Sequence, residues 1–153
     1  MNLDKLIEQL TALIKQLQDY LATPEQNPKP DTKGNLQKFC LAIRTHEGWF
    51  PGSRSQRNNS PGNVRYSSVG YLPIYGDVKR DAQNFAIFRD YATGYLYLQN
   101  LVKDKIKKNP TWNFYDFFKV YAPDEDNNDS KRYAEVVAKR LEVPPTTILS
   151  TLM

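Results

Sequence analysis

Cysteine and histidine are almost absent from this chain of 153 residues, which has one of each, Cys40 and His46. A single cysteine excludes an internal disulfide, and one cysteine with one histidine argues against a zinc site. We therefore expect no metal and no cofactor. Cys40 falls on the apolar stripe of a predicted helix, so we expect it to be a small buried hydrophobic residue.

Long hydrophobic runs are also missing. No stretch of about eighteen apolar residues occurs, so we expect no membrane span. The N-terminal segment is amphipathic rather than continuously apolar, so we expect no secretory signal. If the substrate lies outside the cytoplasm, we expect delivery by a virion, a lysis system or another partner.

The composition is that of a soluble globular protein, with 40% hydrophobic and 25% charged residues. The length fits one domain with an appendage. The net charge of +4 favours anionic partners such as nucleic acid, a membrane surface or an acidic wall polymer. Aromatic residues make up 12% of the chain, and ten of them are tyrosines, which can stack on sugars or bases.

The first 22 residues predict a separate amphipathic helix. Apolar residues between positions 3 and 21 are spaced alternately by three and four, as in a heptad seam. This helix either docks on the domain or mediates self-association or docking on a larger assembly. Residues 23–34 contain three prolines and read as a linker. We place a catalytic domain at residues 35–153.

Glu47 lies at the end of a second predicted amphipathic helix, residues 35–48. It continues the apolar stripe one turn beyond Ile43, within roughly 20° of the centre of the stripe. A carboxylic acid there loses solvation, so we expect its pKa to rise. A raised pKa suits a general acid at neutral pH. The alternative is a helix residue that is merely paired and whose carboxylate snorkels to solvent.

The rest of the chain predicts a mainly α domain with a small β element. Residues 51–62 read as a binding loop, and a small hairpin is expected around residues 69–75. Thr93 and Ser130 are the expected N-caps of two later helices. Further helices are expected at residues 113–121 and 146–152, and Trp49 and Tyr133 are expected to face inward.

Three ordered motifs resemble lysozyme-like peptidoglycan hydrolases of phage and bacteria, the broad lytic transglycosylase group. The first is AIRTHEGWFPGSRSQRNNSPGNVRY at residues 42–66, where a glutamate ends a helix before a PGN-x-R-Y loop. A phenylalanine pair followed by a glycine-containing helix comes next, at residues 85–98. The third is YAPDEDNNDSKRY at residues 121–133. Together they span residues 35–141 and imply a lysozyme-like α+β domain.

The resemblance implies cleavage of the β-1,4 bond between N-acetylmuramic acid and N-acetylglucosamine in peptidoglycan. Glu47 would be the general acid and base. The residues implied for substrate binding are Asn63, Arg65, Tyr66, Tyr121 and Asn127. Most glycosidases use a second carboxylate, yet the charged residues between 51 and 66 are all arginines. The acids that come later are Asp77, Asp81, Asp124, Glu125 and Asp126. If none of them reaches the site, a one-acid lytic transglycosylase is favoured over a hydrolytic muramidase, whereas a nearby aspartate that acts on water would give hydrolysis.

Other functions remain open at this stage. The chain could be a noncatalytic wall-binding or virion structural module on the same scaffold. Nucleic-acid binding is disfavoured because the lysines are scattered and no established motif is present. The acidic run at residues 124–129 is expected to form turns rather than a calcium loop, because Asp129 stands where an EF-hand needs glycine. His46 is expected to be structural.

Overall fold

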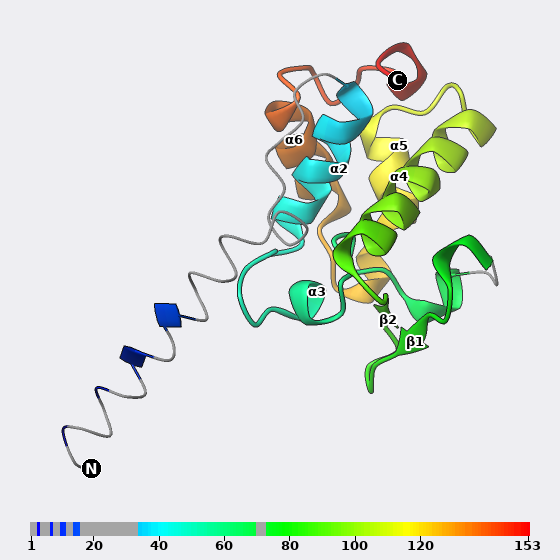
Figure 1. Cartoon of the computed structure of the whole chain (residues 1–153). Coiled ribbons are helices and arrows are strands. Elements are labelled where there is room, and N and C mark those ends of the chain that lie inside the picture. Colours follow the sequence, from blue (N-terminus) through cyan, green and yellow to red (C-terminus); the bar gives the residue numbers. More distant parts are fainter. Residues whose placement is uncertain (1–2, 4–6, 8–9, 12–13, 16–33, 70–72) are drawn as a thin grey trace.

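The computed structural model describes residues 3, 7, 10, 11, 14, 15, 34–69 and 73–153. From Gly34 onward the chain is mainly helical with one small antiparallel sheet (Figure 1), as the sequence predicts. The helices are α2 (Asn35–His46), α3 (Arg54–Arg57), α4 (Tyr91–Lys108), α5 (Phe114–Tyr121) and α6 (Ser130–Arg140). The strands are β1 (Lys79–Arg80) and β2 (Ala86–Ile87), and short 3-10 turns are η1 (Tyr66–Ser68), η2 (Pro73–Tyr75), η3 (Asp124–Asp126) and η4 (Leu149–Thr151).

Aromatic rings from α2 and α5 form the centre of the main core. The ring of Phe39 lies 5.6, 5.2 and 5.8 Å from those of Phe114, Phe117 and Phe118. Apolar faces of α4 and α6 complete this core, and Cys40 is buried in it as predicted. Burial raises the pKa of the Cys40 thiol to about 12, so the thiol is inert at neutral pH.

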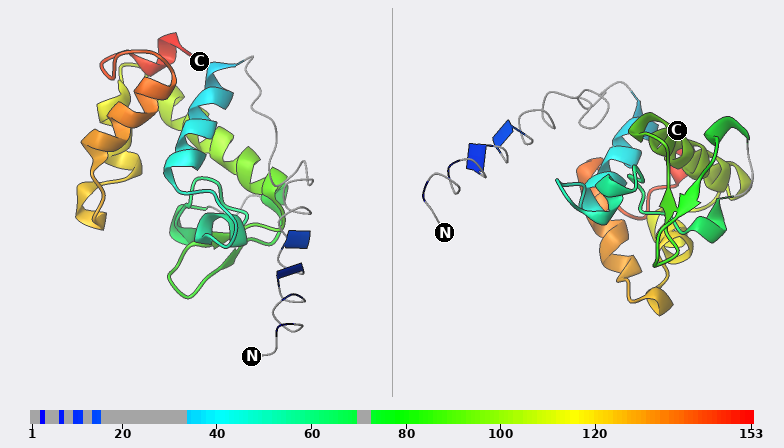
Figure 2. Two further views of the ribbon diagram at one scale, coloured as in Figure 1. Left: turned by 90° about the vertical axis from the view of Figure 1, so that its left-hand side faces the viewer. Right: turned by 60° about the horizontal axis from the view of Figure 1, so that its bottom comes forward.

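A second, smaller core holds the sheet against α4. It consists of Val64, Tyr75, Ala86, Phe88 and Tyr97. Figures 1 and 2 show the sheet and α3 together at one end of the helices, while the C-terminus lies at the other end. The loops that follow α2 are therefore fixed to the helical body on one side of the molecule.

Gly94 allows the loop after α3 to pack closely on α4. A Cβ atom at this position in α4 would lie 1.8 Å from the backbone oxygen of Asn59. The side chain of Asn59 also donates a hydrogen bond to the Phe88 carbonyl at 3.1 Å. The loop after α3 thus rests directly on the backbone of α4 and is tied to the end of β2.

The helix starts differ slightly from prediction. The N-cap of α4 is Asp90, whose side chain accepts from the Thr93 amide at 2.7 Å, so Thr93 is inside the helix rather than its cap. The N-cap of α6 is Asp129, which accepts from the Arg132 amide, rather than Ser130. In both cases an aspartate before the predicted cap supplies the oxygen, and aspartate is among the strongest N-cap residues.

The hairpin is also displaced from its predicted position. Lys79 and Arg80 pair with Ile87 and Ala86, whereas the described residues of 69–75 form turns and residues 70–72 lie outside the description. Asp81 closes the hairpin because its Oδ1 accepts from the amides of Gln83 and Phe85. The predicted loop at residues 51–62 contains α3, and the predicted last helix is reduced to η4.

The described residues near the N-terminus are helical, as predicted. Thr11 donates a side-chain hydrogen bond to the Ile7 carbonyl, and the apolar side chains of Leu3, Ile7, Leu10 and Ile14 are exposed. The predicted linker lies outside the described residues except for Gly34. Among the helices of the described part of the chain, none combines the length and apolar character needed to cross a bilayer.

Candidate functional site

Glu47 is the C-cap of α2, and its side chain faces a cleft rather than the core. The hydroxyl of Tyr133 in α6 donates a hydrogen bond of 2.7 Å to its Oε1 atom. Because Tyr133 is itself nearly buried and stacks on Phe118 at 4.2 Å, its position is fixed by the core. One carboxylate is therefore held at the junction of α2 and α6.

The pKa of Glu47 is raised above its ordinary value, as the sequence predicts. Desolvation by burial is the largest cause, and hydrogen bonds from Tyr133 and Asn63 and the charge of Arg54 act in the opposite direction. The proton is thus held by burial, while polar neighbours limit the shift. A raised pKa makes the protonated form of this carboxyl group more available than that of an ordinary glutamate, as general acid catalysis requires.

Two tyrosines beside Glu47 remain protonated. Desolvation and the charge of Glu47 raise the pKa values of both Tyr121 and Tyr133 well above their ordinary value. Tyr121 donates to the Gly62 carbonyl at 2.8 Å, whereas Tyr133 donates to Glu47. Both phenols therefore act as hydrogen-bond donors, and only Tyr133 acts on the acid.

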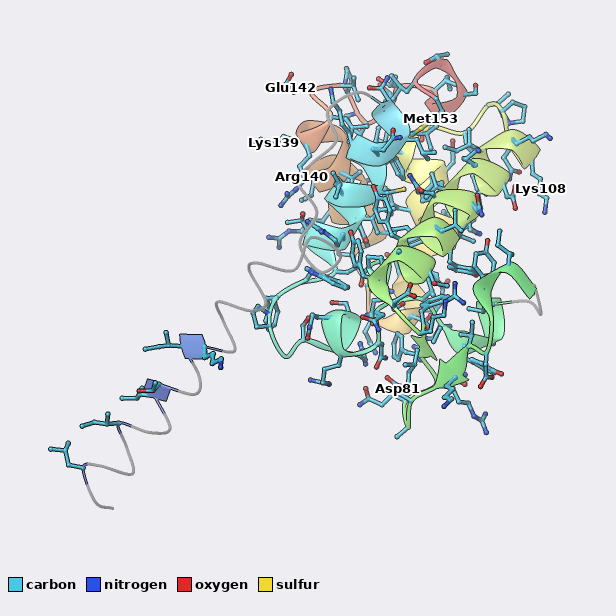
Figure 3. The ribbon with its side chains drawn as sticks, in the orientation of Figure 1. Asp81, Lys108, Lys139, Arg140, Glu142 and Met153 are labelled. Atoms are coloured by element: carbon cyan, nitrogen blue, oxygen red, sulfur yellow. The ribbon has the colours of Figure 1, made fainter. Side chains whose placement is uncertain are left out.

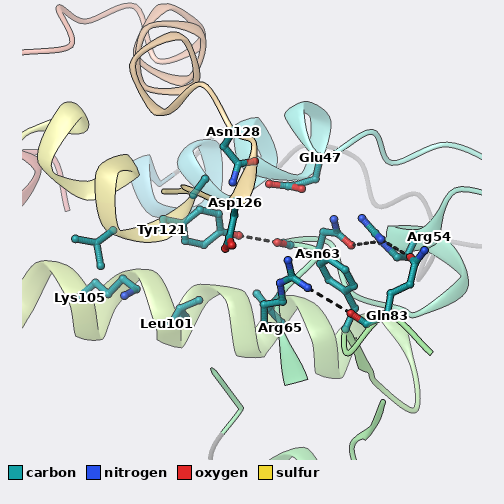
Figure 4. Close-up of a pocket in the computed structure, with 15 residues that line it drawn as sticks. Glu47, Arg54, Asn63, Arg65, Gln83, Leu101, Lys105, Tyr121, Asp126 and Asn128 are labelled. Atoms are coloured by element: carbon teal, nitrogen blue, oxygen red, sulfur yellow. Dashed lines mark hydrogen bonds between the residues drawn. The ribbon is translucent and has the colours of Figure 1, made fainter. Parts of the chain in front are cut away.

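The cleft in front of Glu47 has a volume of about 570 Å³. Figure 4 shows α4 along one wall and the ends of α2 and α5 across from it. The described residues that line it are mostly polar: Glu47, Arg54, Gly62, Asn63, Val64, Arg65, Gln83, Phe85, Leu101, Lys105, Val120, Tyr121, Ala122, Asp126 and Asn128. The lining includes two acids, Glu47 and Asp126, and three cations, Arg54, Arg65 and Lys105. This lining suits an uncharged or anionic ligand.

The loop after α3 carries Asn63 into the cleft. Asn63 has a left-handed backbone conformation with φ of 45°, which asparagine tolerates better than most residues. Its amide nitrogen donates to the Ser60 carbonyl, and its Oδ1 accepts from Arg54 Nε at 3.1 Å. Because its oxygen is used in this way, the side-chain NH₂ group of Asn63 is the donor of the hydrogen bond that lowers the pKa of Glu47.

A cationic corner adjoins Asn63. The guanidinium carbons of Arg54 and Arg65 lie 3.7 and 4.4 Å from the centre of the Phe85 ring. Arg54 also donates to the Gln83 side chain at 2.6 Å, and Arg65 donates to the Gln83 carbonyl at 3.3 Å. The hairpin thus orients both arginines toward the cleft, where they can bind a carboxylate.

Asp126 is the second acid of this cleft. It belongs to η3, is exposed and lines the same cavity as Glu47. Asp81 is used differently: its carboxylate accepts from the side chain of Asn58 and from two backbone amides. Desolvation alone would raise the pKa of Asp81, but these hydrogen bonds have the larger effect and the pKa is lowered. Asp81 therefore stabilises the hairpin as a carboxylate.

Three of the five predicted binding residues line the cleft with Glu47, namely Asn63, Arg65 and Tyr121. Tyr66 is outside the described lining because its amide is tied to the Asn84 carbonyl at the start of η1, and its side chain is exposed. Asn127 is outside it because its left-handed conformation (φ of 61°) ends η3 and leaves its neighbours Asp126 and Asn128 on the cleft.

Three lining residues carried no specific signal in the sequence, namely Gln83, Lys105 and Asn128. Arg54 belongs to the loop predicted to bind, and Asp126 is one of the acids that the sequence offers as a possible second carboxylate. Tyr133 was expected to face inward, but its partner could not be identified from spacing. Trp49 packs edge-on against Tyr91, with centroids 5.0 Å apart, rather than lining the cleft described here.

Within the described residues, no group of three or more His, Cys, Asp or Glu side chains is placed to hold a metal ion.

Comparisons with protein-family models, with curated proteins and with solved structures return no match for this chain. The chemistry of the cleft therefore has to be deduced from its own residues.

Proposed function

We propose that this protein cleaves the β-1,4 bond between N-acetylmuramic acid and N-acetylglucosamine in peptidoglycan. The observation that carries the proposal is a single half-enclosed carboxyl group, Glu47, with a raised pKa, at the edge of a polar cleft. The three motifs that resemble lytic transglycosylases support the substrate. On this proposal the domain is lysozyme-like.

The reaction uses Glu47 twice. The protonated carboxyl group donates its proton to the glycosidic oxygen as the bond to the anomeric carbon breaks. The resulting carboxylate then accepts the proton of the 6-hydroxyl of the same muramic acid, whose oxygen bonds to the anomeric carbon. The product is a 1,6-anhydromuramyl end, and Glu47 returns to its protonated form.

Each half of this sequence needs a different property of Glu47. Burial favours the protonated acid, and the hydrogen bond from Tyr133 stabilises the carboxylate that forms when the proton leaves. The pKa of Glu47 is therefore balanced between donor and acceptor roles. This balance is what a residue that acts as acid and then as base requires.

The cleft offers partners for the substituents of the sugars. The amide of Asn63 and the guanidinium of Arg65 can hydrogen-bond an N-acetyl or lactyl group. Lys105 adds a positive charge on the α4 side of the cleft. These groups suit a glycan that carries amides and carboxylates.

A hydrolytic muramidase is the second candidate, because Asp126 lines the same cleft. In that reaction Asp126 would activate water or stabilise the positively charged sugar, as the second carboxylate of glycosidases does. The product would then be a free reducing muramic acid. The one-acid reaction is favoured because Asp126 is exposed on a short 3-10 turn and lacks the enclosure of Glu47.

The test is digestion of purified peptidoglycan by the wild type and by Glu47→Gln. We expect turbidity to fall with the wild type, anhydromuramyl ends in the product masses, and a loss of rate of about a hundredfold or more in the variant. Free reducing muramic acid would support the hydrolytic reaction. Binding without turnover by the wild type would overturn both and indicate a noncatalytic wall-binding module.

A further inference from the structure

A second cavity lies beside Glu47. It has a volume of about 210 Å³ and is lined by His46, Glu47, Asn128, Asp129, Arg132 and Tyr133. It shares Glu47 and Asn128 with the larger cleft, so these two residues stand between the two spaces. The larger cleft and the smaller cavity therefore adjoin at Glu47.

The smaller cavity is lined by one cation, Arg132, and by two acids, Glu47 and Asp129. The imidazole of His46, which also lines it, lies against the ring of Tyr133, with centroids 3.8 Å apart and ring planes tilted by 30°. Burial lowers the pKa of His46, and the positive charges of Arg140 and Arg132 lower it further. Both guanidinium groups are therefore close enough to influence the imidazole. Figure 3 shows Arg140 on the part of α6 that lies beside α2.

Arg132 is the cation that lines the cavity itself. Its side chain is exposed, and it forms no ion pair within the part of the chain that the structure describes. The nearby carboxylate of Asp129 is engaged by the start of α6, where it accepts the Arg132 amide at 2.9 Å. The guanidinium of Arg132 thus remains available to a ligand.

We propose that the smaller cavity binds a second part of the glycan strand and that Arg132 binds a carboxylate carried by a muramyl residue there. This inference rests on the proposed function for the identity of the polymer. Arginine suits the role because its guanidinium can bind a carboxylate through two parallel hydrogen bonds. Arg132 is then a specificity residue that separates muramyl glycans from glycans without carboxylates.

The carboxylate has two possible sources. In glycan strands stripped of peptide, the lactyl group of muramic acid ends in a free carboxylate. In strands that keep their peptides, this group is an amide, and the carboxylates lie farther out on the peptide. Both sources offer the same chemistry to Arg132, and substrates of the two kinds distinguish them.

The experiment measures binding in the full chain carrying Glu47→Gln, so that no cleavage interferes. Peptide-free strands and peptide-bearing strands are each used as prepared and after carbodiimide amidation of their carboxylates. Calorimetry compares Glu47→Gln with Glu47→Gln/Arg132→Gln. The matched control is Glu47→Gln/Lys131→Gln, at the exposed neighbouring lysine outside the lining of the cavity. Arg132→Lys tests the paired geometry, and circular dichroism checks the fold of each variant.

We expect Arg132→Gln to weaken binding by about tenfold on strands with free carboxylates, a typical effect of losing a charge-assisted hydrogen bond. Amidation of the strands should weaken their binding to Glu47→Gln by at least about tenfold. It should weaken their binding to Glu47→Gln/Arg132→Gln by a factor about ten times smaller. The strand type that shows this difference identifies the source. Equal effects of amidation in both proteins would overturn the inference. The proposed function fails separately, when wild-type protein binds strands but never cleaves them.

Discussion

The hydroxyl of Tyr133 and the Oε1 atom of Glu47 lie 2.7 Å apart across 86 residues of sequence, and their hydrogen bond joins α6 to the end of α2. The donor is fixed by the aromatic core, whereas the acceptor opens on the cleft. The protonation of Glu47 is therefore coupled to the packing of two helices. A substitution in the core side of this pair should act on the chemistry of the cleft.

Tyr133→Phe removes the donor and keeps the ring. Because this hydrogen bond lowers the pKa of Glu47, we expect that pKa to rise further in the variant. The alkaline limb of kcat/KM should move to higher pH, and the protein should lose about 1 kcal/mol of stability. A pH–rate profile on soluble peptidoglycan fragments measures the shift.

Tyr121→Phe is the matched control for that profile. Its hydroxyl donates to the Gly62 carbonyl instead of Glu47, so a similar loss of stability is expected without a similar shift of the limb. Identical profiles for the two variants would show that the hydrogen bond to Glu47 does not set the pKa.

Glu47→Gln should stabilise the protein, and increasingly so as the pH rises. The folded-state pKa of Glu47 is raised, so the folded state binds this proton more tightly than the unfolded state. Stability consequently falls as pH rises from the ordinary glutamate value of 4.5 through the raised pKa, and the loss is complete above it. Glutamine does not titrate and keeps an oxygen for Tyr133.

Urea unfolding of the wild type and Glu47→Gln at a series of pH values measures this effect. The free-energy difference should grow through that pH window and then level off. Glu135→Gln, at an exposed glutamate of α6, is the control for loss of a charge alone. A difference that shrinks with increasing pH would contradict the downward slope expected from a raised pKa.

Asp126→Asn separates the two reactions proposed for the cleft. In a one-acid transglycosylase the variant should keep its rate within about twofold and still produce anhydromuramyl ends, since Asp126 would then take no part in proton transfer, whose loss costs about a hundredfold or more. Glu125→Gln is the control, because Glu125 is an exposed acid of the same turn outside the described lining. A loss of about a hundredfold that spares the Glu125 variant would instead place Asp126 in the chemistry.

Much of the helical framework could be predicted because it depends on local patterns. The stripe that buries Phe39, Cys40 and Ile43 also determines where Glu47 emerges, so periodicity alone located the acid. The helix predicted at residues 113–121 corresponds to α5, and the structure adds that Asn113 and Asp116 form a capping box at its start.

The rest depends on contacts between distant segments. Nothing local indicates that Tyr133 bonds to Glu47 or that Asp126 reaches the cleft, because both follow from how α5 and α6 turn back on α2. The strands escape detection because each has two residues, too few for an alternating pattern. Tyr66 and Asn127 belong to the predicted motifs, yet their neighbours Arg65, Asp126 and Asn128 line the cleft instead.

Gly94→Ala should destabilise the protein and disturb the cleft together. The new methyl group would meet the Asn59 carbonyl at 1.8 Å, and a backbone atom cannot move aside without shifting its loop. Overpacking of this kind costs about 1–3 kcal/mol. Since the same loop carries Asn63, the KM for soluble fragments should rise as well. Urea unfolding and steady-state kinetics measure both effects, with Ala92→Ser, at an exposed position of α4, as the control.

Removal of residues 1–33 should leave the domain from Gly34 onward folded. Among the residues that the structure describes, the two buried clusters contain none before Phe39, and the partly buried residues packed on them begin at Leu36. The start of α2 is held from within, because Asn35 donates to the Leu152 carbonyl at 2.7 Å and the Gly34 carbonyl accepts from Lys38. We expect a change in unfolding free energy within about 0.5 kcal/mol, as for surface changes.

The same deletion tests the role of the N-terminal helix. Leu3, Ile7, Leu10 and Ile14 follow a heptad spacing and are exposed, so self-association would bury them against other copies. Light scattering should then show fewer copies per particle for the truncated protein than for the full chain, after the mass of the removed residues is taken into account. The variant Ile7→Asp/Ile14→Asp should have the same effect with the chain otherwise complete. The same number of copies in all three proteins would leave the domain itself or an assembly partner as the target of the helix, and a truncated protein that fails to fold would contradict the division of the chain at Gly34.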